Sequence, residues 1–217
     1  PQSRMVYDLD KVRADRASVS DRAYRTDAAA HLERLCRHLC EAFPRHFAGI
    51  HPCGQNTGEW FYHGSWERPL SGYDAATVAA FRAWLKSRGN RDSETATVPT
   101  DTERRGHPFG FLRDPAREQR LIDFARFQQM EMADHVAALA AACRRGTAGK
   151  KLVIFFYGYL FEFGALANGA PTSGHYALRR LLGGRDIDIL CAPLSYTDRE
   201  WLGTAPCMSA AESVREA

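Results

Sequence analysis

Three short apolar runs, each preceded by a stretch with helical periodicity, constrain the fold of this chain more than any other feature. The runs lie at 46–52, 152–157 and 187–192. The second run, LVIFFY, has no charged residue, which is typical of a strand covered on both faces in a parallel sheet. Helices that alternate with such strands predict an α/β fold of parallel β/α units, either an open doubly wound sheet or part of a β/α barrel.

Apolar residues at helical spacing predict the helices between these strands. The expected helices span 27–43, 74–87, 115–146 and 174–184. Asp27 is the expected N-cap of the first helix, and Ser173 is the expected cap of the last. Residues 88–114 are too polar and irregular for a core, so they predict a long functional or mobile loop within one domain that spans 1–217.

Composition excludes several partners. The net charge of +3 is spread along the chain without a basic block, which argues against nucleic acid. No apolar window reaches the length of a membrane span, and the first 20 residues do not resemble a secretion signal. The six cysteines lack CxxC pairs, which favours reduced, buried thiols and a cytoplasmic location.

No metal or other cofactor is expected. The residues that most resemble a set of metal ligands lie on the first helix, and they are His31, Cys36, His38 and Cys40. At about 100° per residue these four side chains do not share a face, so the cysteines are interpreted as core residues.

The segments that follow the three strands predict where function lies. In parallel architectures, functional groups collect on loops at the C-terminal ends of strands. Here these loops read GQNTGEWFYHGSW, GYLFEFGALANGAPTSGH and PLSYTDREWLG, and all contain aromatic residues, carboxylates and glycine. Aromatic faces stack on sugars while polar side chains bind their hydroxyls, so this composition indicates a carbohydrate ligand.

Glycoside cleavage needs two carboxyl groups beside the scissile bond, one protonated and one ionised. Glu59 and Glu162 are the candidates for these catalytic roles, and Glu59 beside Trp60 and Phe61 would be partly desolvated. The candidate substrate-binding residues are Gln55, Asn56, Trp60, Tyr157, Tyr159, His175, Tyr196 and Arg199.

Each of these residues also has a structural interpretation. Glu59 is equally explained as a solvated loop residue, and Glu162 as the partner of an arginine such as Arg199. His175 at a helix start could cap that helix, and the tyrosines could be core aromatics with satisfied hydroxyls.

Motifs of competing enzyme classes are absent or poor. The sequence contains no GxGxxG after a strand, no GxxxxGK[ST], no HExxH and no GxSxG. Ser195, Cys53 and Cys191 offer only weak nucleophiles for an unrelated α/β hydrolase.

The order HFAGIHPCGQNTGEWFYHGSW, FRAWLKSR, LIDFARFQQMEMADHVAALA, VIFFYGYLFEF and DIDILCAPLSYTDR resembles the β/α-barrel glycoside hydrolases related to the family-42 β-galactosidases. This resemblance implies a retaining clan in which the acid/base glutamate follows strand four and the nucleophile follows strand seven. It places Glu59 at the acid/base position. Gly58 stands directly before Glu59, where the clan typically has asparagine.

The resemblance further implies that the three apolar runs are strands four to six, so that the chain forms a partial TIM barrel without the nucleophile of strand seven. Such a sheet would expose unpaired strand edges. Either copies of the chain associate and cover them, or the chain is the ordered part of a longer polypeptide, and we expect association. The alternative hypothesis is a non-catalytic carbohydrate-binding or self-assembling barrel fragment.

Overall fold

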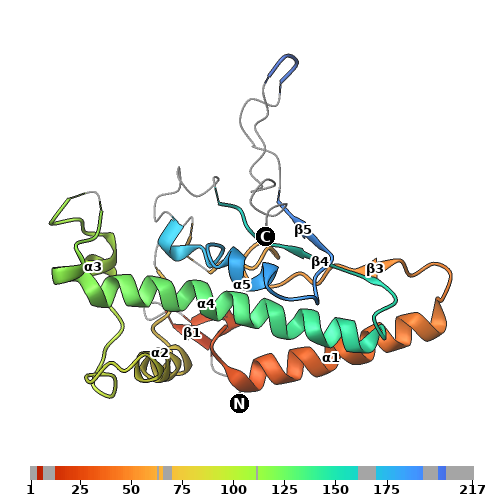
Figure 1. Cartoon of the computed structure of the whole chain (residues 1–217), viewed down its shortest axis with the longest axis horizontal. Coiled ribbons are helices and arrows are strands. Elements are labelled where there is room, and N and C mark those ends of the chain that lie inside the picture. The colour runs from red at the N-terminus through yellow and green to blue at the C-terminus, as the bar shows by residue number, and fades with distance from the viewer. Residues whose placement is uncertain are drawn as a thin grey trace.

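The fold contains a three-stranded parallel sheet (Figure 1). The computed structural model describes residues 4–6, 13–62, 64–65, 70–110, 112–160, 170–192 and 200–203. The strands are β3 (Gly49–Ile50), β4 (Leu152–Phe156) and β5 (Ile189–Cys191), and they pair in that order. All three fall within the predicted apolar runs. Their parallel pairing in chain order confirms the predicted β/α units.

The longest helices, α1 (Arg22–Ala42) and α4 (Pro115–Gly146), pack side by side along much of their length (Figure 1). Gly146 at the end of α4 allows this close approach, because a Cβ there would lie 2.4 Å from the Glu33 carbonyl oxygen. Any larger residue at this position would push the two helices apart.

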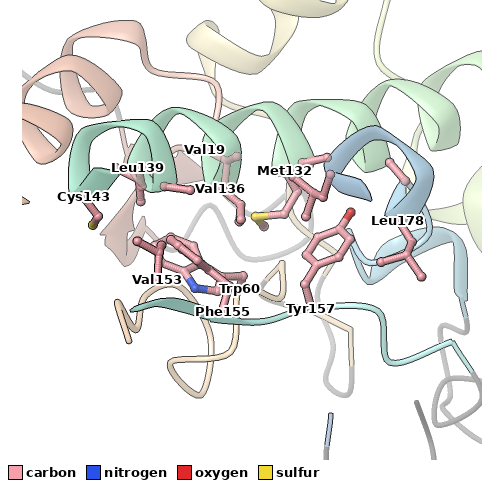
Figure 2. Close-up of a cluster of buried hydrophobic side chains, with 14 of the residues drawn as sticks. Val19, Trp60, Met132, Val136, Leu139, Cys143, Val153, Phe155, Tyr157 and Leu178 are labelled. Atoms are coloured by element: carbon pink, nitrogen blue, oxygen red, sulfur yellow. The ribbon is translucent and has the colours of Figure 1, made fainter. Parts of the chain in front are cut away.

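The main core lies between α4 and one face of β4 (Figure 2). Val153 and Phe155 are 0% exposed on this face, together with the α4 residues Met132 and Val136. Leu152, in contrast, is 45% exposed. The prediction that this strand is covered on both faces is therefore wrong for the described residues. The strand alternates between a face packed on α4 and a face that the described part of the chain leaves partly open.

Two predicted helix caps are wrong. Helix α1 begins at Arg22, five residues before Asp27, since Asp21 is its N-cap and accepts from the Ala23 amide at 2.9 Å. Helix α5 (Leu178–Leu182) has no side-chain cap, and the Ser173 hydroxyl instead accepts from the His175 amide at 3.1 Å. Before α1 several cap-forming residues lie close together, and the apolar pattern alone does not choose among them. The last helix, expected at 174–184, begins only at Leu178, too far from Ser173 to be capped by it.

The polar segment 88–114 follows α2 (Ala75–Ser87) and contains a short helix, α3 (Asp101–Arg105), which the sequence pattern did not predict. Thr100 and Glu103 form a capping box at its start. Arg104 then ties α3 to the rest of the fold, donating to the Ser71 carbonyl at 2.7 Å and to Gln128 Oε1 on α4 at 3.1 Å. This part of the segment is thus anchored to α4.

A second missed feature is an antiparallel pair, β1 (Arg4–Val6) with β2 (Arg13–Ala17). Its second strand, RADRA, has neither β-branched nor large apolar residues, so it carries no strand pattern.

Among the described cysteines, Cys36 and Cys143 are buried as predicted, whereas Cys53 is exposed. None of the described helices is both long and apolar enough to cross a membrane. Within the described ranges, no group of three or more His, Cys, Asp or Glu side chains is arranged to hold a metal ion.

Candidate active site

The loop that carries Glu59 leaves the C-terminal end of β3 and is unusually contorted. Gln55, Thr57 and Trp60 all have positive φ angles, of 59°, 56° and 65°. Residues other than glycine rarely adopt this conformation, and each such residue costs roughly 1 kcal/mol or more. Strain of this kind concentrates at functional sites, so the backbone around Glu59 is itself an indication of function.

Close packing holds the loop in this shape. The Trp60 ring lies over Gly54, where an added Cβ would come within 2.5 Å of the indole. The Trp60 indole N–H donates to the Pro52 carbonyl at 3.1 Å. Because the ring is 2% exposed, it anchors the loop in the core.

The Glu59 carboxylate accepts two hydrogen bonds, one on each oxygen. The Thr57 hydroxyl donates to Oε2 at 2.8 Å, and the Tyr159 hydroxyl donates to Oε1 at 3.0 Å. Thr57 belongs to the loop after β3, whereas Tyr159 follows β4. The carboxylate is therefore fixed where the ends of two neighbouring parallel strands meet, and it is partly exposed.

His175 supports Glu59 from the protein interior. Its Nε2 bonds to the Glu59 carbonyl oxygen at 2.9 Å, and its Nδ1 accepts from the Tyr159 amide at 3.4 Å. Together these bonds require the neutral tautomer with the proton on Nε2. Burial lowers the pKa of His175 to about 3, so the ring stays neutral and keeps this tautomer at physiological pH.

The imidazole is also enclosed by aromatic rings. Phe61 stacks against it with ring centroids 4.2 Å apart, and Tyr157 stacks on it at 4.6 Å. The Tyr157 hydroxyl donates to the Gly174 carbonyl at 2.7 Å, which fixes the segment next to His175. His175 is 0% exposed, so it acts on Glu59 through the backbone.

The structure thus brings several predicted site residues together around Glu59, but mostly beneath it. Tyr157, Tyr159 and His175 are each at most 2% exposed. Gln55 is 8% exposed, and its amide nitrogen donates to the Ala17 carbonyl at 3.3 Å, which ties the loop to β2. Asn56 is partly exposed beside the carboxylate. The remaining predicted residues, Glu162, Tyr196 and Arg199, lie outside the described residues.

The open face of the sheet adds residues that the sequence analysis missed. Ile50 pairs with Val153 and packs with it into the core under α4, so the next residue, His51, points to the opposite face. On that face the His51 ring lies 4.2 Å from the Phe156 ring, and Phe156 lies 6.3 Å from Tyr159.

This row of rings leads from the open face of the sheet to Glu59. His51 is partly buried, which lowers its pKa, and its Nε2 has no hydrogen-bond partner in the described part of the chain. Strict alternation from Ile50 could have identified His51 from the sequence.

Comparison with known proteins supports the fold. No protein-family model matches the chain, and neither does any curated protein. Among solved structures, the chain is similar to the catalytic domain of β-amylase from Paenibacillus polymyxa, a TIM-barrel glycoside hydrolase, with a TM-score of 0.61 at 13% identity. The two structures share an α/β fold with parallel strands.

The match covers 98% of this chain and 58% of the β-amylase chain. At this identity the likeness concerns the fold alone. Three parallel strands in chain order are consistent with a partial barrel. The resemblance to the family-42 β-galactosidases remains a prediction.

Proposed function

We propose that this chain carries the general acid/base of a glycoside hydrolase, and that Glu59 is this residue. The observation that carries the proposal is the carboxylate held by Thr57 and Tyr159 at the C-terminal edge of the parallel sheet. Functional groups of parallel β/α folds collect at this edge. The glycoside-hydrolase-like fold supports the same assignment.

In this proposal, Glu59 protonates the oxygen of the departing sugar. Its protonated carboxyl donates from one oxygen while the other still accepts a hydrogen bond. Glu162 is the proposed second carboxylate. A carboxyl separation of about 5 Å would predict retention of configuration, and one of roughly 6.5–9.5 Å would predict inversion.

The proposed ligand is a carbohydrate on the open face of the sheet beside Glu59. Phe156 offers a ring for stacking, and the partly exposed Asn56 offers polar atoms for hydroxyls. Tyr157, Tyr159 and His175 would act from beneath, as positioning residues for the carboxylate. The alternative, a carbohydrate-binding module without catalysis, shares this face.

The test compares wild type with Glu59→Gln on aryl glycosides that have good and poor leaving groups. Loss of a general acid should slow cleavage of the poor leaving group by roughly 10²–10⁴-fold, and cleavage of the good one much less. Glu94→Gln is a matched control, because its side chain is 83% exposed and it should leave both rates unchanged.

Equal loss on both substrates would contradict an acid role for Glu59. A complete lack of hydrolysis by wild type, together with measurable sugar binding, would favour the carbohydrate-binding module.

A further inference from the structure

An open groove of about 480 Å³ lies away from the Glu59 carboxylate, between the end of α2, the first half of α4 and the segment before α5. Its size is within the range of sites for small molecules, which is roughly 300–1,000 Å³. The residues that determine its chemistry are Trp84, Arg88, Arg126, Gln129, Met130 and Tyr176.

The walls of the groove are apolar and partly aromatic. Trp84 and Met130 are partly buried, and Tyr176 is 41% exposed. Gln129 is 8% exposed and already engaged, since it donates to the Pro171 carbonyl at 3.1 Å and accepts from the Tyr176 amide at 2.8 Å. The groove therefore suits a flat apolar body and offers few partners for the many hydroxyls of a sugar.

The rim of the groove is cationic. The Arg88 guanidinium lies over the Trp84 ring, 4.6 Å from its centroid, and Arg126 lines the groove from α4. No acidic residue is among the described residues that line the groove. Two guanidinium groups at a groove whose described lining holds no carboxylate favour an anion, and carboxylates match their planar fork best.

We propose that this groove binds an aromatic carboxylate, with its ring between Trp84, Met130 and Tyr176 and its carboxylate at Arg88 and Arg126. The site is independent of glycoside cleavage, because none of its residues belongs to the proposed acid/base machinery. It adjoins that machinery in the chain, since Tyr176 directly follows His175.

The experiment titrates the protein with cinnamate by isothermal calorimetry. Two further probes separate the contributions of the charge and of the ring to binding. Acetate has the charge without the ring, and cinnamyl alcohol has the ring without the charge. We expect saturable binding of cinnamate and at least tenfold weaker binding of both other probes. The Arg88→Gln/Arg126→Gln double variant should also bind cinnamate at least tenfold more weakly.

Arg117→Gln is the matched control, since Arg117 also lies over an aromatic ring, that of Phe109, and lies outside the groove. Arg126→Glu, a single charge reversal on an exposed helix position, serves as a second variant if the double variant unfolds. Glu59→Gln should bind cinnamate as wild type does, which keeps this proposal separate from the proposed function. No cinnamate binding by wild type, or undiminished binding by the arginine variants, would overturn the proposal.

Discussion

Acidification from pH 7 to pH 5 is expected to destabilise the fold through two histidines that are 0% exposed, His135 and His175. Burial lowers the pKa of each from an ordinary value of 6.5 to about 3, and for His135 the nearby Arg25 charge adds to the effect. Both rings therefore stay neutral in the folded protein over this pH range, whereas in the unfolded chain they take up protons near pH 6.5.

The free energy of unfolding follows from this difference. The contribution of each neutral histidine to the free energy of unfolding is fully present above pH 6.5. It is lost as the pH falls toward 3, because the unfolded state then binds more protons than the folded state. One pKa unit corresponds to about 1.4 kcal/mol, so each histidine should remove about 2 kcal/mol between pH 7 and pH 5. Together they remove about 4 kcal/mol, a large part of the 5–15 kcal/mol typical of a domain.

Urea unfolding at pH 7, 6 and 5 measures this loss. His135→Gln and His175→Gln each remove one titrating group, so the loss of stability between pH 7 and pH 5 should be about 2 kcal/mol smaller in each variant than in wild type. The comparison is made between pH values within one variant, so the constant cost of the substitution cancels. Equal wild-type stability at pH 7 and pH 5, or a full pH dependence in both variants, would refute the reasoning.

Two further substitutions test the geometry of the Glu59 loop. Tyr159→Phe keeps the ring but removes the hydroxyl that binds Glu59 Oε1, so we expect roughly tenfold slower hydrolysis of aryl glycosides. An unchanged kcat would show that this hydroxyl does not position the acid. Gly54→Ala places a methyl group 2.5 Å from the Trp60 ring and should lower the free energy of unfolding by about 1–3 kcal/mol. Gly183→Ala, whose nearest contact would be 3.6 Å, is the control, and an equal shift in melting temperature for both variants would contradict the packing argument.

Much of the fold could be predicted because its elements carry strong periodic patterns. The apolar runs and the apolar stripe of α4 can be recognised from short stretches of sequence. The alternation of helix and strand then predicts parallel pairing. Elements with weak patterns were missed: α3 has five residues and β2 is polar. The wrong cap at Asp27 arises because several nearby residues can cap a helix equally well, whereas the helix expected directly after Ser173 begins only at Leu178 and has no side-chain cap.

Some features of the candidate site could likewise be predicted from the sequence, and others could not. That Glu59 follows a strand and has aromatic neighbours could be predicted, because these are properties of adjacent residues. Which face of the sheet the site occupies was decided by α4, which buries Val153 and Phe155 and leaves His51 and Phe156 on the other side.

The contacts that hold Glu59 in place could not be predicted, because they come from residues far away in the chain. The Tyr159 hydroxyl reaches its carboxylate across 100 residues of chain, and the His175 ring reaches its carbonyl across 116. Periodicity predicts which face of an element is apolar, but it does not predict how close two elements lie in space when they are far apart in the chain. The parallel sheet supplies that distance, because it places the ends of successive strands about 4.8 Å apart and so gathers distant residues at one edge.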